Sequence, residues 1–312
     1  MSPKRTRPLR LGVALGGGAA RGWAHIGVLL WLREQGIHPQ VVAGTSIGAL
    51  VGGAEVAGQL ERLDAWVRTL EWSDVVALLD FRFSGGLIRG QKLFGFFRKE
   101  FTDVNIEQLQ RPYGAVAADI DTGTEVWLRE GSLLEAVRAS VALPGLFSPH
   151  RLDGRWLVDG GLVNPVPVSL CRALGAERII AVDLNSDLLQ QRLREQVQRR
   201  LAGARSEREP EEDAWWHLVS RALKAQTSRF KANLFGSDDM PSLVEVIVQS
   251  VYIMQSRITR ARMAGDPPDV LVTPRVGHIR TMEFHRAAEA IEAGYLAAEQ
   301  SARQIEGLLT GA

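Results

Sequence analysis

A serine at position 46 lies in a setting that is typical of a catalytic nucleophile. It is the central residue of the pentapeptide GTSIG, Gly44 to Gly48, directly after a run of apolar, strand-forming residues. Glycines on both sides allow a tight turn, which would present the hydroxyl beside the N-terminus of a helix over about 47–58. The same pattern also fits a purely structural role, in which Ser46 caps that helix.

A second glycine-rich turn comes earlier in the chain, within LGGGAARGWAHIGVL at residues 15–29. Small residues after a strand expose backbone N–H groups, which can bind an anion such as the oxyanion of an acyl-transfer reaction. A dinucleotide-binding turn is the main competitor, but it needs an acidic residue at the end of the second strand, where this chain has VVAGTS. A Walker loop is excluded, because no Gly-Lys-Ser/Thr follows the glycines.

A serine nucleophile needs a base, and two kinds of residue could supply it. A late histidine would complete a Ser–acid–His triad, yet none of the candidates lies in a partner motif: His150, His217, His278 and His285. Asp159 ends a strand and enters the Gly-Gly turn of RWLVDGGLVNPVP. A carboxylate in a partly desolvated pocket can accept a serine proton directly. The common alternative for Asp159 is an Asp-Gly turn that only bonds its own backbone.

The elements that must position these residues alternate between strands and helices. Strand-like apolar runs are expected at residues 11–15, 40–43, 114–118, 125–128, 156–158, 179–184 and 270–272. Helical spacing links many of them, continues from about 244 to a stop at Gly265, and begins again near Met282. Alternation of this kind predicts an α/β layered fold with a mainly parallel sheet.

One domain over residues 1–312 is expected, with a polar helical insertion at about 187–242. That segment is dense in Arg, Gln and Glu and has no strand-like run. Its Trp215, Trp216 and neighbouring basic residues would suit a membrane interface or a lid over the site. A packed helix with a solvated basic face explains them at least as well.

The composition excludes several classes of protein. The 37 basic and 36 acidic side chains nearly cancel, so no global field favours nucleic acid. Cys171 is the only cysteine and is expected in the core, and no Cys/His spacing resembles a metal site, which fits a reducing cytoplasm. The basic N-terminus is a poor match to a cleaved signal, and no run of 18 apolar residues occurs. Any membrane contact is therefore expected to be peripheral, on the inner surface, and the oligomeric state stays open.

In this order, GGGAARG, GTSIG and DGG resemble the motifs of the patatin-like phospholipase family, and RASVALPGLFSP and MAGDPPDVLVTP are similar to its bacterial RssA-type branch. The resemblance covers most of the chain. It implies a three-layer α/β/α fold that hydrolyses fatty-acyl esters of lipids, such as (lyso)phospholipids, through an acyl-enzyme. It implies no metal and no cofactor.

By position, the resemblance makes Ser46 the nucleophile and Asp159 the general base of a dyad. It assigns the oxyanion hole to the N–H groups of Gly17, Gly18 and Ala19, with Arg21 bracing that loop. Many members have glycine where this chain has Ala19. A positive φ angle at that position would be less comfortable for alanine.

Two other functions stay open at this level. A general carboxylesterase or thioesterase could use the same dyad with lipids as poor substrates, and a regulatory lipid-binding protein could keep the pocket but turn over slowly. The apolar stretches at residues 78–101 and 141–147 would line an acyl pocket, although core packing explains their composition equally well.

Overall fold

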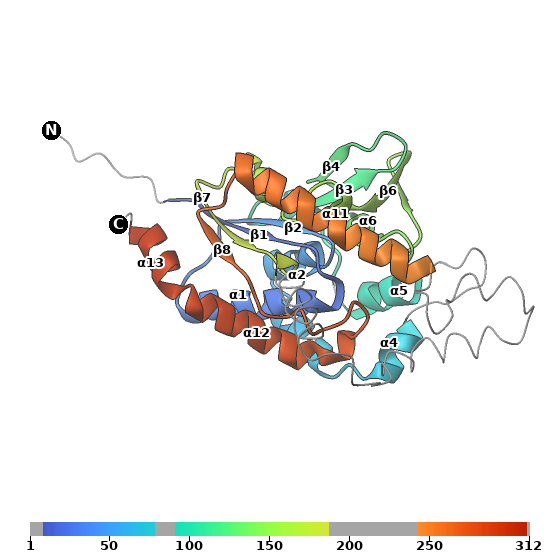
Figure 1. Ribbon diagram of the computed structural model, residues 1–312, viewed down its shortest axis with the longest axis horizontal. Helices are drawn as coiled ribbons and strands as arrows, with labels where there is room; N and C mark the ends of the chain where they lie inside the picture. The colour runs from blue at the N-terminus through green and yellow to red at the C-terminus, as the bar shows by residue number, and fades with distance from the viewer. Residues whose placement is uncertain (1–8, 79–90, 101, 187–242, 311–312) are drawn as a thin grey trace, which may run out of the picture.

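The computed structural model describes residues 9–78, 91–100, 102–186 and 243–310. These residues form an eight-stranded, mostly parallel sheet with helices on both faces (Figure 1). The α/β/α fold predicted from the sequence is therefore confirmed. The expected insertion at about 187–242 lies outside the described residues, and so do Trp215, Trp216 and His217.

The strands follow the order β5-β6-β3-β2-β1-β7-β8, and β4 pairs with β3 as well. Their bounds are Leu11–Leu15 (β1), Val41–Thr45 (β2), Tyr113–Asp119 (β3), Glu125–Leu128 (β4), His150–Leu152 (β5), Arg155–Asp159 (β6), Arg178–Val182 (β7) and Val270–Val272 (β8). All seven expected strands are present. The sequence did not predict β5, because three residues with two polar side chains are too short to show alternation.

The central strands are buried on both faces, as parallel sheets usually are. Every residue of β1, β2 and β3 is buried, which explains why, apart from Thr45 and Asp119 at the strand ends, these residues are apolar or glycine. Alternate side chains supply two cores: Val13 and Leu15 belong to one, and Ala14, with Cys171 from the opposite helix layer, belongs to the other. Cys171 therefore lies in the core, as expected.

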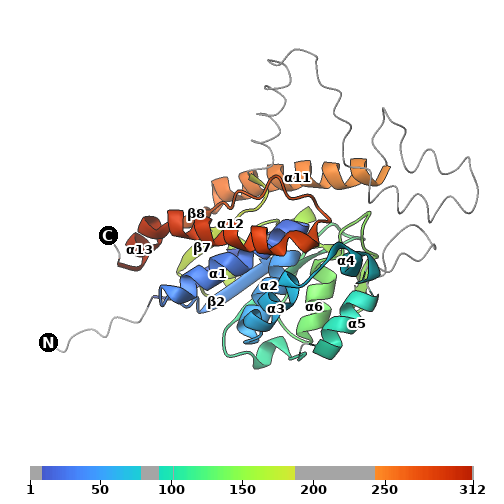
Figure 2. The same cartoon turned by 90° about the horizontal axis from the view of Figure 1, so that it is seen from below.

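Two helix layers enclose the sheet (Figure 2). One face packs against α1 (Ala24–Glu34), α2 (Ile47–Val56) and α12 (Ala287–Gln300), and the other against α7 (Val168–Ala173) and α11 (Leu243–Gly265). Four further helices gather beside α2: α3 (Leu60–Arg68), α4 (Trp72–Leu78), α5 (Gln91–Glu100) and α6 (Leu133–Ser140). The end of α11 at Gly265 agrees with the predicted stop.

The C-terminal helix differs from its prediction. It was expected to begin near Met282, but the chain first forms a 3-10 turn at Phe284–Arg286 and α12 begins only at Ala287. The carboxylate of Glu283 accepts from the N–H of Arg280, which holds the chain in a turn there. A second break at Ser301 separates α12 from α13 (Ala302–Thr310).

Candidate active site

Ser46 occupies a strained turn between β2 and α2. Its φ of 56° and ψ of −127° form a conformation that residues other than glycine rarely adopt. A Cβ on Gly44 would lie 2.4 Å from the carbonyl oxygen of Gly48, and one on Gly48 would lie 2.2 Å from that of Leu15. Both distances are clashes, so the G-x-S-x-G spacing is a steric requirement of this turn.

The structure brings Ser46 and Asp159 together. The Ser46 hydroxyl donates to Asp159 Oδ2 at 2.5 Å, and the N–H of Gly161 donates to Oδ1 at 2.7 Å. Asp159 is 1% exposed. Burial raises the pKa of its carboxyl to about 6, although the hydrogen bonds from Ser46 and Gly161 act in the opposite direction. At neutral pH the carboxylate is ionised, and it is a stronger base than an exposed aspartate.

Ser140, the last residue of α6, holds the backbone of the Ser46 turn. The N–H of Ser46 donates to Ser140 Oγ at 2.8 Å, and that hydroxyl donates to the carbonyl of Val116 at 2.6 Å. Ser140 is fully buried. The sequence gives no sign of this contact, because an isolated serine in a helix carries no local signal.

The glycine-rich loop after β1 passes beside Ser46. A Cβ built on Gly17 would lie 3.5 Å from that of Ser46. The N–H of Gly17 donates to the carbonyl of Pro165 at 2.9 Å, so the resemblance assigned one donor that the fold already uses. Within the described residues, the N–H groups of Gly18 and Ala19 make no hydrogen bond. Ala19 has a φ of +48°, a positive value that is strained for alanine and would be relaxed for the glycine that many family members have there.

Arg21 connects this loop to three other elements. Its guanidinium is buried, donates to Asn185 Oδ1 at 3.1 Å and to the carbonyl of Ile279 at 3.5 Å, and lies 4.7 Å from the ring centre of Tyr252. These partners come from the segment after β7, the turn before α12, and α11. The contacts suit the bracing role that the resemblance implies for Arg21.

Asn185 and Gln255 link the glycine-rich loop to the turn that carries Asp159. The Asn185 amide donates to the carbonyl of Gly17 and to Gln255 Oε1, both at 3.3 Å. Gln255 of α11 packs on Gly161, because a Cβ there would lie 2.3 Å from Gln255 Nε2. Both amide side chains are buried. Sequence reasoning missed them, since neither lies in a recognisable motif.

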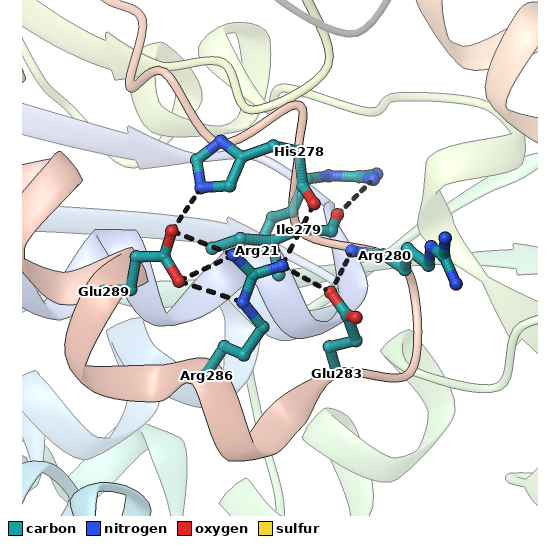
Figure 3. Close-up of polar contacts among 7 residues, drawn as sticks. All are labelled: Arg21, His278, Ile279, Arg280, Glu283, Arg286 and Glu289. Carbon is teal, nitrogen blue, oxygen red and sulfur yellow. Dashed lines mark hydrogen bonds and ion pairs between the residues drawn. The ribbon is translucent and has the colours of Figure 1, made fainter. Parts of the chain in front are cut away.

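An ion-pair network fixes the turn before α12. Figure 3 shows Arg286 between Glu283 and Glu289, with His278 on the other side of Glu289. Arg286 donates to Glu283 at 2.8 Å, to Glu289 at 2.9 Å and to the carbonyl of His278 at 3.1 Å. The network therefore holds the turn that presents the Ile279 carbonyl to Arg21.

The triad alternative receives no geometric support from the described histidines. His150 pairs with Glu135, His278 pairs with Glu289, and His285 packs edge-on against a tryptophan. None of the histidines in the described part of the chain hydrogen-bonds to Ser46 or Asp159.

His25, which the sequence analysis did not single out, hydrogen-bonds to the backbone of the glycine-rich loop. It is fully buried, and its Nε2 lies 2.7 Å from the carbonyl oxygen of Gly16. Burial lowers the pKa of His25 to about 4, so the ring is neutral at pH 7. Because a carbonyl only accepts, Nε2 carries the proton and donates it to Gly16.

An apolar cavity opens beside Ser46 and contains about 790 Å³ of empty space, which includes open solvent. Apart from Ser46, its lining residues are all apolar. Both stretches considered from the sequence contribute: Leu93, Phe94, Phe97, Val141, Leu143, Leu146 and Phe147. These residues line the cavity, as an acyl-pocket role would require, whereas residues 79–90 lie outside the described part.

Within the described ranges, no helix combines the length and apolarity needed to cross a bilayer. The same residues contain no group of three or more His, Cys, Asp or Glu side chains arranged to hold a metal ion.

Comparison with known proteins places this site in a family. A family model described as patatin-like phospholipase matches residues 13–172, which include Ser46, Asp159 and the glycine-rich loop. An uncharacterized NTE family protein of Mycobacterium tuberculosis is 34% identical over 347 residues, covering 95% of this chain and 92% of that protein.

Animal relatives match over a shorter region. Patatin-like phospholipase domain-containing protein 6 of Mus musculus is 34% identical over 184 residues, which is 56% of this chain and 14% of that protein. Neuropathy target esterase sws of Drosophila melanogaster is 37% identical over 184 residues, which is 56% of this chain and 13% of that protein.

A solved structure extends the likeness to the fold. The crystal structure of VipD from Legionella pneumophila superimposes with a TM-score of 0.51 and covers 96% of this chain and 66% of that one. At 13% identity, this similarity concerns the fold alone. On the family match and the near full-length bacterial relative, the chain belongs to the patatin-like phospholipase family of hydrolases.

Proposed function

We propose that this protein is a serine acyl hydrolase that cleaves fatty-acyl esters of (lyso)phospholipids or related lipids through a Ser46–Asp159 dyad. The observation that carries the proposal is the 2.5 Å hydrogen bond between the two side chains at the wall of an apolar cavity. Family membership supports the lipid-ester chemistry. The dyad and the acyl-enzyme are parts of the proposal.

The first half of the reaction forms an acyl-enzyme. Asp159 takes the hydroxyl proton while Ser46 Oγ attacks the ester carbonyl carbon, and the carbonyl π electrons move to its oxygen. The N–H groups of Gly18 and Ala19 stabilise this oxyanion, helped by the positive end of α2. Collapse of the tetrahedral intermediate breaks the ester C–O bond, and the proton on Asp159 passes to the leaving alcohol.

The second half releases the fatty acid. A water molecule attacks the acyl carbon and gives its proton to Asp159, and collapse then returns that proton to Ser46 Oγ. Asp159 therefore acts first as base and then as acid in each half. No external co-reactant other than water is needed.

The cavity favours a lipid acyl chain over a small polar ester. The cavity lining is apolar apart from Ser46, so each methylene of the substrate buried there would favour binding by about 0.8 kcal/mol. This supports the lipid substrate over the general carboxylesterase alternative. Contact with a membrane would then be peripheral, at the inner surface in the cytoplasm, and co-sedimentation with phospholipid vesicles tests that part.

The function is tested by exposing the protein to a fluorophosphonate and measuring its intact mass, followed by assay of fatty acid released from lysophosphatidylcholine. We expect one adduct and steady release of fatty acid. A protein that neither gains mass nor releases fatty acid would contradict the proposal and favour the regulatory lipid-binding alternative.

Hydrolysis should depend on the ionised form of Asp159. Because the pKa of this carboxyl is about 6 and the base must be unprotonated, kcat/KM should be constant above pH 7 and fall about tenfold per pH unit well below 6. A pH profile with an ester that does not itself titrate measures this. A limb centred near pH 4, the range of an exposed aspartate, would contradict the raised pKa.

Asn185 should act as a positioning residue for the oxyanion loop. Asn185→Ala removes the contacts to Arg21 and to the carbonyl of Gly17. We expect kcat to fall about tenfold with little change in KM, since misplacing oxyanion donors affects the transition state more than substrate binding. Asn105→Ala, at an exposed asparagine, is the matched control and should keep kcat within about twofold. A change in KM alone would contradict the positioning role.

A further inference from the structure

A second, smaller cavity lies directly beside the one at Ser46. It contains about 340 Å³ of empty space, including open solvent, between α2, α3, α5 and α6, which Figure 2 shows grouped together. Leu50, Phe97 and Val137 line both cavities. These three side chains, here called the partition, therefore stand between the two spaces.

One face of α2 runs from Ser46 through the partition into the second cavity. Leu50 lies one helical turn beyond Ser46, and its N–H donates to the Ser46 carbonyl at 3.3 Å. Gly53, Ala54 and Ala57 continue the same face and line the second cavity. At 1.5 Å per residue, Leu50 is about 6 Å and Ala57 about 16 Å along the helix from Ser46. An acyl chain that follows this face meets Leu50 first.

The partition has one partly buried member and two fully buried ones. Phe97 and Val137 are each 2% exposed, and Phe97 is held in an aromatic cluster with Trp66, at 5.4 Å between ring centres. Leu50 is only partly buried. It is also the one large side chain on a face that otherwise carries glycine and alanine in this region. Truncating Leu50, which packs against the edge of the main core, would remove one of the three side chains between the two cavities.

We propose that the partition is the floor of the acyl pocket and that Leu50 limits the length of the acyl chain the enzyme accepts. The inference rests on the proposed function, in which Ser46 carries the acyl group. The second cavity is then a latent acyl subsite for long-chain substrates, closed by the partition, in which Leu50 is the member that a substitution can most readily remove.

The test compares hydrolysis of p-nitrophenyl esters from butyrate to palmitate by the native protein and by Leu50→Ala. We expect the palmitate-to-butyrate ratio of kcat/KM to rise about tenfold or more, because methylenes that the partition excludes gain a site. Leu93→Ala is the matched control, since Leu93 lines the first cavity but not the second. That variant should change the ratio by less than about threefold.

The reverse substitution keeps the test decisive if Leu50→Ala does not fold. Leu50→Phe enlarges the partition and should lower the same ratio while hydrolysis of butyrate continues. An unchanged ratio in both folded Leu50 variants, or an equal rise in Leu93→Ala, would overturn the partition and leave the dyad untouched. Native protein without Ser46-dependent hydrolysis of any ester would instead count against the proposed function.

Discussion

Ser46→Ala is expected to lower kcat/KM for lipid esters by about 10⁴- to 10⁶-fold, as loss of a serine nucleophile does in other hydrolases. Alanine has no oxygen to form the acyl-enzyme, and the residual rate would come from water attack beside the remaining oxyanion donors. The fluorophosphonate adduct should disappear from the intact-mass spectrum at the same time. The two readouts are independent, because the reagent reports an activated serine without requiring a lipid.

The substitution should leave the fold intact at a modest cost. It removes the hydroxyl that donates to Asp159 at 2.5 Å and leaves a buried carboxylate with one fewer donor, which costs about 1–3 kcal/mol. Thermal unfolding measures this. Ser301→Ala, in the turn between α12 and α13, is the matched control and should keep both activity and adduct. Activity within tenfold of native, with an adduct on another residue, would place the nucleophile elsewhere.

The two dyad candidates were predictable because each has a local signal. Ser46 lies in five consecutive residues whose glycines are sterically required, and Asp159 heads a Gly-Gly turn. Their meeting was not predictable from periodicity, because 113 residues separate them. It depends on the strand order, which sets β6 against β3 with Asp159 opposite Ala117.

The supporting residues could not be found in the same way. Ser140, Asn185 and Gln255 are single polar residues, and their partners belong to elements far away in the sequence. Nothing nearby marks such a residue as buried and fully bonded. A motif can also suggest a role that the fold does not allow. The position of Gly17 suggested an oxyanion donor, but its N–H already donates to the carbonyl of Pro165.

Asp159→Asn is expected to lower kcat/KM by about 10²- to 10⁴-fold, the usual contribution of a general base. The amide can still hydrogen-bond to Ser46 but cannot accept its proton. Fluorophosphonate labelling should become much slower and the adduct should stay on Ser46. Full activity in this variant would refute the assignment of Asp159 as the base.

The same variant should be more stable than the native protein at neutral pH. The carboxyl has a pKa of about 6 when folded and an ordinary value of 3.8. Between these values the folded state binds more protons than the unfolded state, so stability falls as pH rises through this window. Above pH 6 the whole penalty is present, at most about 3 kcal/mol. Asparagine has no charge to bury, and Asp159→Asn should gain up to that amount at pH 7 and almost nothing at pH 4.

Urea unfolding at pH 4 and pH 7 measures the free energy of unfolding of the native protein and the variant. Asp121→Asn, at an exposed aspartate, is the charge-matched control and should show no such pH-dependent gain. A variant less stable than native at pH 7 would mean that the hydrogen bonds from Ser46 and Gly161 outweigh burial. If the gain is found together with the loss of activity, the two have one cause. The burial that makes Asp159 a strong enough base for Ser46 is then also what destabilises the folded protein, a trade of stability for activity at a single carboxyl group.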